Sequence, residues 1–501
     1  MNTIIFATIF LTIFILIVWL VLIILRIKSL KFFLLIVLLT ITFIDTIRKL
    51  VGGQIFLLTA IDFSLLLLFF AFYTSSFLRG RLRFGILREI EPLLKISLWL
   101  YIGIVLIQAL NPNVPNWLVR LAGLRSYLLA IPMMGIGWYI AKNWKIIDYE
   151  KAGKVLLFLI SLTVIFGVYG FLIRLFKFQA PLYSITLPLE GGHLIHSFGF
   201  MNVELIPSFF ASAKRWARYL VFLYPFAWAC LIVAGRYKIA FILSILTFIG
   251  IFISGSREGL IMFLFFQVAQ YMITKSYQFI ADLKRIMFFF FRATQYMITK
   301  PYKFIPYVTA ILWALFLITL VNPYLYLVDK AKEKAKEKLQ YRIQFSLSTP
   351  EDWIFRFNYM FFQPLVIITE GRPEVFTGLG IGSYGQETKL LKKKLYFPWI
   401  PEVARDAGLV KIIVELGIFG LLAFLMLQFS ILSYLRYLPK AKNDPLFIAS
   451  SLVIIIWLIL FLKAHTVLSD LMLNIFYWYY FGILVYRVQL FKKHTFKERC
   501  T

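Results

Sequence analysis

The chain has 501 residues, of which 61% are hydrophobic and 15% are charged, and its formal net charge is +29. A water-soluble core of this size could not bury so much apolar surface, so lipid must cover it. The apolar stretches are continuous, which excludes a transmembrane β-barrel and predicts an all-α integral membrane protein. The basic residues are scattered between these stretches, so no nucleic-acid partner is expected.

Apolar segments recur along the whole chain and predict a single polytopic membrane domain over residues 1–501, a bundle of about twelve or thirteen transmembrane helices. The first segment lacks a positively charged start and a cleavage site, so it is expected to be a retained helix. Segment 30–44 is short, and whether it spans the bilayer stays open. The predicted segments are 4–25, 30–44, 55–78, 96–110, 126–141, 155–173, 216–234, 239–254, 260–273, 306–323, 408–434, 446–463 and 470–486.

Lys and Arg concentrate in alternate connections, as they do in the cytoplasmic loops of membrane proteins. This bias predicts an N-terminus outside and a C-terminus in the cytoplasm. Two long connections, 174–215 and 324–407, then lie outside as outer loops and could form a small exoplasmic cap. The basic, cytoplasmic connections are 26–31, 79–95, 141–154, 235–238, 274–305, 435–445 and 487–501.

Against this trend, basic residues stand at the outer ends of several segments. Arg120 and Arg125 lie in the outer connection 111–125, and Arg257 lies in the tight hairpin Ser254-Gly255-Ser256-Arg257-Glu258. An arginine at membrane depth is costly unless it is paired or faces a cavity, so Arg257 is a functional candidate; the alternative is that Glu258 merely neutralises it. Guanidinium groups match phosphate oxygens, so a shared outer cavity would suit a diphosphate headgroup. The same reasoning applies to Lys214, Arg215 and Arg218.

Residues 263–280 recur at 288–305 with 12 of 18 positions identical, which indicates a local duplication. The connection 274–305 is expected to be a cytoplasmic amphipathic segment without chemistry of its own. Residues 329–340 (DKAKEKAKEKLQ) favour a solvated helix, with an electrostatic guide for an anionic headgroup as the alternative.

Two further patterns in the outer loops are weak. Gly380-Ile381-Gly382-Ser383-Tyr384-Gly385 matches GxGxxG, but the βαβ context of a dinucleotide site is missing; a tight turn and an anion-binding backbone nest both stay open. His193 and His196 stand three apart without further ligands, so no metal is expected. Asp406, beside Arg405, precedes segment 408–434, where a carboxylate could act as a general base, as the N-cap of the helix, or as both.

Four features in this order resemble the family of O-antigen ligases and O-antigen or exopolysaccharide polymerases. They are Asn111-Pro112 to Gly123-Leu124-Arg125, Ser254-Gly255-Ser256-Arg257, Gly378-Leu379-Gly380-Ile381-Gly382-Ser383 and Glu415-Leu416-Gly417-Ile418-Phe419-Gly420. The resemblance implies transfer of a polyprenyl-diphosphate-linked glycan at the outer face of the cytoplasmic (inner) membrane, without a cofactor or a required metal. Asp406 and Ala407 stand where the ligases have His and Asn, which looks more like the polymerase branch.

The resemblance therefore implies a polysaccharide polymerase-type glycosyltransferase surrounded by membrane lipids, with a lipid-linked oligosaccharide donor and a glycan acceptor. Asp406 is the expected catalytic residue. Transfer to a lipid or protein acceptor, as by an O-antigen ligase, is an alternative. A polysaccharide or lipid transporter is another, although Asp62 is the only clear acid near the middle of a predicted span, and no half-to-half repeat is visible. The expected substrate-binding residues are Arg257, Arg125, Arg405, Arg356, Arg218, Arg215 and Lys214.

Overall fold

The computed structural model describes a large part of the chain. The described residues are 42, 89–114, 116–176, 195–198, 201–204, 208, 210, 212–274, 367–368, 373–384, 407–439, 441, 443–464 and 466–500. Their elements, in chain order, are α5 (Pro92–Ala109), α6 (Trp117–Leu128), α7 (Met133–Asn143), α8 (Ile146–Phe176), β1 (Ile195–Phe198), β2 (Met201–Glu204), α9 (Ala213–Val233), α10 (Tyr237–Ser254), α11 (Arg257–Thr274), α17 (Pro373–Thr377), α18 (Gly408–Leu432), η4 (Ser433–Tyr437), α19 (Pro445–Lys463), α20 (Thr466–Ser469) and α21 (Leu471–Cys500).

The expected all-α polytopic membrane fold is confirmed. Among the described residues, eight helical segments are long and apolar enough to cross a membrane, and each overlaps a predicted segment. The remaining apolar helix, α11, is shorter and overlaps segment 260–273. Segments 4–25, 55–78 and 306–323 lie outside the described residues, so the total of twelve or thirteen stays a prediction. The eight are Pro92–Ala109, Val119–Asn143, Ile146–Leu172, Ala213–Val233, Tyr237–Ser254, Gly408–Tyr437, Pro445–Lys463 and Leu471–Lys493.

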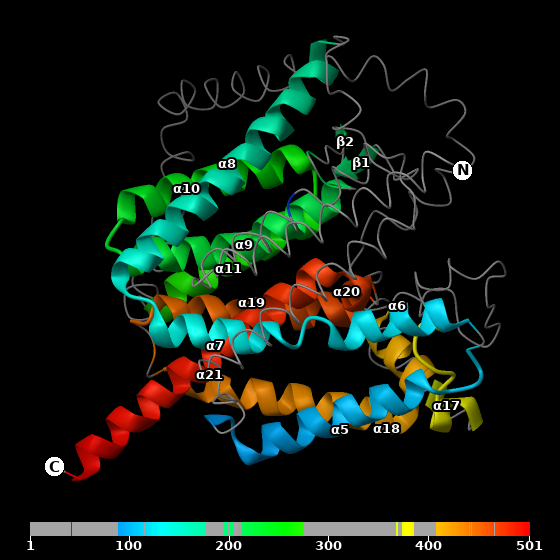
Figure 1. Cartoon of the computed structure of the whole chain (residues 1–501). Helices are drawn as coiled ribbons and strands as arrows, with labels where there is room; N and C mark the ends of the chain where they lie inside the picture. The colour runs from blue at the N-terminus through cyan, green and yellow to red at the C-terminus, as the bar shows by residue number, and fades with distance from the viewer. Residues whose placement is uncertain are drawn as a thin grey trace, which may run out of the picture.

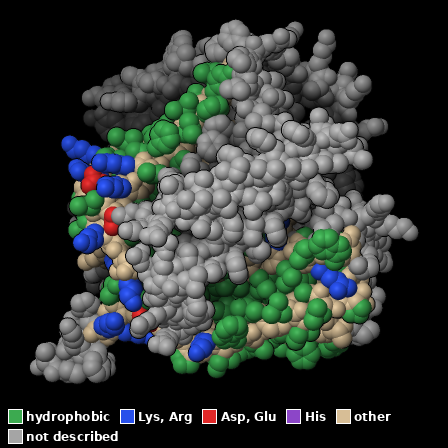
Figure 2. All heavy atoms as spheres, viewed as in Figure 1, with side chains coloured by type: hydrophobic (Ala, Val, Ile, Leu, Met, Phe, Trp, Pro, Cys, Tyr) green, Lys and Arg blue, Asp and Glu red, His purple; other side chains and the backbone are tan. Residues whose placement is uncertain are grey.

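Helices α9 and α21 are central: α7, α8, α10, α11 and α19 pack on one or both of them, and α5 packs on α18 (Figure 1). In α9 and in α21, 89% of an 18-residue apolar stretch of the helix is buried inside the protein, against 33% in α10 and 39% in both α5 and α8. The outer helices expose large apolar side chains such as Ile107, Phe158 and Phe241. Hydrophobic side chains form much of the visible described surface (Figure 2), as expected for a lipid-facing one.

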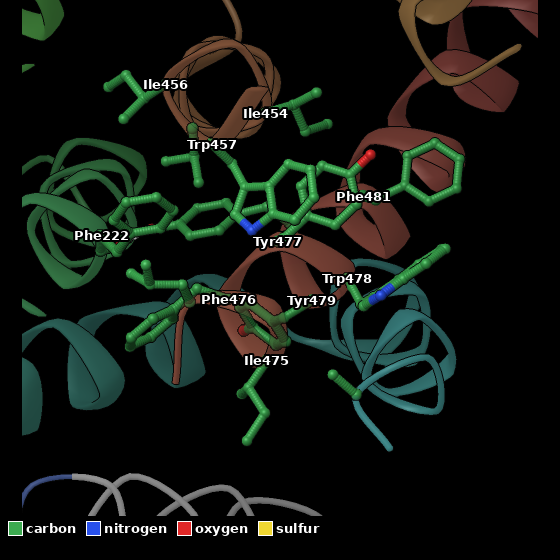
Figure 3. Close-up of a cluster of buried hydrophobic side chains, with 14 of the residues drawn as sticks. Phe222, Ile454, Ile456, Trp457, Ile475, Phe476, Tyr477, Trp478, Tyr479 and Phe481 are labelled. Carbon is green, nitrogen blue, oxygen red and sulfur yellow. Dashed lines mark hydrogen bonds between the residues drawn. The ribbon is translucent and has the colours of Figure 1, made fainter. Parts of the chain in front are cut away.

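Aromatic side chains fill the centre of the bundle. Trp457 of α19 stacks on Tyr477 of α21 with ring centroids 4.1 Å apart (Figure 3). Phe222 of α9 meets Phe476 at 6.2 Å, and the Tyr477 hydroxyl donates a 2.6 Å hydrogen bond to Gln428 of α18. These contacts join α9, α18, α19 and α21 into one core.

The structure differs from the predicted segment 126–141, because two helices, α6 and α7, take its place with a turn at residues 129–132 between them. Pro132 precedes α7 and has no N–H to continue a helical ladder, which accounts for the interruption. Gly137 of α7 then lies against the backbone of Tyr479, and Gly482 of α21 lies against Met134. A β-carbon at either glycine would collide with a carbonyl oxygen, so small residues permit this close helix contact.

The helix connections gather at two ends of the bundle. One, here the Glu258 end, is where α9, α11, α18 and α21 begin and where α5, α10 and α19 finish. The other, here the Glu91 end, carries ion pairs of Arg436 and Lys492 with Glu91 at 2.8 and 2.7 Å, and of Arg236 with Glu150 at 2.9 Å. Lys, Arg, Asp and Glu side chains gather at the left edge of Figure 2.

The antiparallel pair β1 and β2 lies within the predicted outer loop 174–215, with Ile195 opposite Glu204 and Phe198 opposite Met201. Thr42, within predicted segment 30–44, is buried, and its hydroxyl lies 2.7 Å from the Tyr219 hydroxyl of α9. This bond joins the N-terminal part of the chain to α9 near the Glu258 end. The duplicated copy 288–305 and residues 329–340 lie outside the described residues.

Candidate functional site

At the Glu258 end, three cationic side chains surround one carboxylate. Glu258 Oε1 accepts a 2.6 Å hydrogen bond from Arg218 Nε, and Oε2 lies 3.0 Å from Lys463 Nζ and 3.2 Å from Lys214 Nζ. We call Lys214, Arg218, Glu258 and Lys463 the Glu258 cluster. Burial alone would raise the pKa of the Glu258 carboxyl, but the surrounding cations outweigh it and hold that pKa well below its ordinary value.

Local sequence signals bring these side chains together. Ser212 caps α9 by accepting the Arg215 N–H, so Lys214 and Arg218 follow one turn apart on the same helix face. Gly255 ends α10 in the left-handed conformation at φ 66°, and the Ser256 hydroxyl then accepts the Gly259 N–H at the start of α11. Glu258 is thereby placed in the first turn of α11.

The cluster has a buried and an exposed side. The side chains of Arg218 and Glu258 are 8% and 7% exposed, whereas those of Lys214 and Lys463 are 50% and 43% exposed. Arg218 Nη2 is buried and has no hydrogen-bond partner among the described residues. Three cations thus share one anion, and a donor remains available on the buried arginine.

Two further predicted residues, Arg215 and Arg125, lie on elements that contact the start of α21. Arg215 Nη2 is 3.8 Å from Asp470, which precedes α21 and accepts the Met472 N–H. Arg125 lies on α6, and the carbonyl of the next residue, Ser126, accepts a 3.4 Å hydrogen bond from Asn474 of α21. The end of α6 and the start of α21 are therefore in contact.

A second ionic cluster lies within the bundle, one turn into α18. Lys411 and Glu415 are fully buried, with Nζ and Oε1 3.7 Å apart. Glu415 Oε2 accepts the Tyr127 hydroxyl at 2.7 Å, Oε1 accepts the Tyr384 N–H at 2.8 Å, and Lys411 Nζ donates to the Ser469 hydroxyl at 2.9 Å. This Glu415 cluster ties α18 to α6, to α20 and to the segment after α17.

The glycine-rich segment 378–384 packs into a break of α18. Gly417 has φ 72° and ψ −175°, which interrupts the helical ladder. The Leu379 and Gly380 N–H groups donate to the carbonyls of Val414 and Glu415 at 2.8 and 3.1 Å. The amides of Leu379 and Gly380 thus complete the broken helix, whereas the Tyr384 amide binds the Glu415 carboxylate. Gly385, the last residue of the motif, lies outside the described residues.

The structure locates only part of the predicted site. Arg257 opens α11, although its side chain is not among those described, and Asp406, Arg405 and Arg356 lie outside the described residues. The N-cap position of α18 is occupied by Ala407, so the N-cap interpretation of Asp406 is wrong. Gly408, the next residue, lies against Phe461 of α19, two positions before Lys463.

Several charged residues of these clusters were not among the predicted site residues. Lys463 stands at the outer end of a predicted segment, so the criterion that selected Lys214 would have found it. Glu258 was interpreted only as a neighbour of Arg257, and its bonds to α9 and α19 required the fold. Lys411 and Glu415 stand inside the predicted segment 408–434, where charged residues are rare, so this signal could have selected them. His196 lies in β1, and His193 is outside the described residues.

Comparison of the sequence with known protein families and with curated proteins finds no match. The function must therefore be argued from the residues of this chain and their arrangement.

Proposed function

We propose that this chain is a polysaccharide polymerase-type glycosyltransferase of the cytoplasmic membrane. It would transfer a polyprenyl-diphosphate-linked glycan to the hydroxyl of an acceptor glycan at the outer face, with the N-terminus outside and the C-terminus in the cytoplasm. The observation that carries the proposal is the Glu258 cluster, in which Lys214, Arg218 and Lys463 share one carboxylate. Such a surplus of cations suits the diphosphate of a membrane-anchored donor.

The reaction breaks the bond between the anomeric carbon of the donor and its diphosphate. The acceptor hydroxyl oxygen attacks that carbon from the opposite face, the lipid diphosphate leaves with the bonding electrons, and the hydroxyl proton passes to the Asp406 carboxylate. Cations at the leaving group stabilise the charge that develops there. Asp406 acts as the general base of this step.

The position of α18 supports this assignment. Gly408, two residues after Asp406, packs against Phe461 near the end of α19, and Lys463 follows in the same last turn. The backbone next to the proposed base thus lies against the last turn of α19, which carries Lys463 of the Glu258 cluster. Arg215, Arg125, Arg257, Arg405 and Arg356 are proposed to complete the binding of the donor.

An O-antigen ligase-type enzyme would use the same site with a lipid or protein acceptor. A transporter is the candidate from another class, and a specific observation favours it: α18 is interrupted at Gly417 beside the buried pair Lys411 and Glu415. Interrupted helices and buried charges mark binding sites in many transporters. Here segment 378–384 fills the break, which favours a rigid framework.

The test is an assay of the purified protein in liposomes with lipid-linked glycan repeats, analysed as a product ladder on gels. Asp406→Ala and Arg257→Ala are each expected to lower product formation at least about 100-fold. Arg236→Ala, at the Glu91 end, is the matched control and should retain activity. Each variant is checked for membrane insertion and thermal unfolding.

Turnover by Asp406→Ala at the wild-type rate would remove Asp406 as the base. Single additions to a lipid or protein in place of a ladder would favour the ligase. Movement of labelled lipid-linked glycan across the bilayer without any new glycosidic bond would favour the transporter.

A further inference from the structure

The two carboxylate oxygens of Glu258 bind different partners within the Glu258 cluster. Oε1 holds the buried Arg218 through a 2.6 Å bond to Nε. Oε2 faces Lys463 and Lys214, whose side chains are about half exposed. The contact on Oε1 is shielded from water, and those on Oε2 are open to competition by another anion.

Two observations point to a ligand that enters from the exposed side. Arg218 is more than nine-tenths buried, yet its Nη2 atom has no hydrogen-bond partner among the described residues. The ammonium groups of the two lysines compete with each other for the same oxygen, Oε2 of Glu258. An anion with several oxygens could accept from both lysines and from Nη2, whereas Glu258 offers them only Oε2.

We propose that Glu258 is a built-in counter-anion: it holds Lys214 and Lys463 in place until the diphosphate of a membrane lipid takes both lysines from Oε2. Glu258 keeps Arg218 oriented through Oε1 during this exchange, so that Nη2 meets the incoming phosphate. Lys463 is thereby assigned as a diphosphate-binding residue. The identity of the ligand rests on the proposed function, and the exchange explains why an acidic side chain belongs in an anion site.

The Glu258 carboxylate is then expected to weaken the affinity for the ligand, because its negative charge repels the phosphate. Glu258→Gln removes that charge and retains an oxygen that can accept from Arg218 Nε. We expect this variant to bind a diphosphate about five- to tenfold more tightly than the wild type. If Glu258 served only to assemble the cations, its loss would weaken binding instead.

The experiment measures binding of inorganic pyrophosphate and of a short prenyl diphosphate to the full-length protein in a nonionic detergent, by calorimetry. Glu150→Gln is the matched control, because Glu150 also pairs with two cations, Lys154 and Arg236, but at the other end of the bundle. It should change neither affinity by more than about twofold, since it is remote from the site. Binding by Glu258→Gln that is no tighter than wild type would overturn the proposal.

Lys463→Met and Lys214→Met give a second route that does not depend on the stability of Glu258→Gln. Each is expected to weaken binding of both probes about five- to tenfold and to reduce its salt dependence. Unchanged affinity in both lysine variants would also overturn the proposal. Tighter binding of the prenyl diphosphate than of pyrophosphate supports a lipid-borne ligand, and equal binding overturns that source.

Binding and transfer remain separable in this design. If the wild type shows no glycan transfer but Glu258→Gln binds the probes more tightly, the proposed glycosyltransferase activity is rejected and the proposed exchange at Glu258 is retained. Normal transfer with weaker probe binding by Glu258→Gln would retain the enzyme and reject the exchange.

Discussion

At the scale of single residues, the pair of Lys411 and Glu415 carries a large free-energy cost of desolvation. Both side chains are fully buried, and removing two charges from water costs several kcal/mol per ion. Good hydrogen bonding offsets this cost: both oxygens of Glu415 accept a bond, and Lys411 donates to Ser469. The pair is stable because its polar atoms find partners on surrounding elements.

Changing Lys411 alone should therefore be harmful. Lys411→Met leaves the Glu415 carboxylate buried without its cation, and we expect a loss of about 3–5 kcal/mol in stability. The double variant Lys411→Met, Glu415→Gln removes both charges and should recover most of that loss. Thermal unfolding of the three proteins in the same detergent measures the difference. A double variant as unstable as the single one would show that the uncompensated charge is not the cause.

At the scale of elements, α18 depends on segment 378–384. The break at Gly417 would leave carbonyls of the preceding turn without partners inside the bundle, a costly state away from water. Leu379 and Gly380 supply the missing donors. Gly417 itself lies against Phe376 and Gly378, where a side chain would collide with the backbone.

Gly417→Ala should destabilise the protein by about 1–3 kcal/mol, because alanine disfavours a positive φ and its β-carbon would meet the carbonyl oxygen of Phe376. Gly103→Ala is the matched control: a β-carbon there meets no atom within 4 Å, and α5 is regular, so stability should be unchanged or slightly higher. Thermal unfolding in detergent again provides the measurement. Equal unfolding temperatures for the two variants would contradict the role assigned to Gly417.

These elements also show what the sequence could and could not predict. Hydropathy predicted a segment at 408–434, close to the observed Gly408–Leu432, because a long apolar run has few alternatives to a membrane helix. It could not predict the break at Gly417, since hydropathy reports burial and not backbone conformation. The cationic residues Lys214 and Arg218 were predicted from their position at a helix end. Their shared partner, Glu258, is 40 or more residues away and needed the packing of α9 against α11.

At the scale of the whole molecule, the two ends of the bundle differ in the kind of ion pairing they carry. At the Glu91 end, Glu91 and Glu150 each hold two basic side chains that are about half exposed, and the largely buried Asp444 pairs with a single cation, Arg487, at 2.6 Å. At the Glu258 end, the carboxylate and its arginine are buried. Exposed pairs contribute little to stability, and those of Glu91 and Glu150 agree with the predicted bias of Lys and Arg toward the cytoplasm. Three cations around one buried carboxylate need a further reason, and the proposed ligand binding supplies one.

The proposed function requires the Glu258 end to face outward, which single cysteines can test. Asn113, in the connection after α5, and Asn143, at the end of α7, are both exposed and lie at opposite ends. In a background with Cys500→Ser, the remaining Cys230 is buried and should not react. Asn113→Cys should react with a membrane-impermeant maleimide in intact cells, and Asn143→Cys only after permeabilisation. The reverse pattern would place the Glu258 cluster in the cytoplasm, where the proposed donor headgroup is not displayed, and would exclude transfer at the outer face.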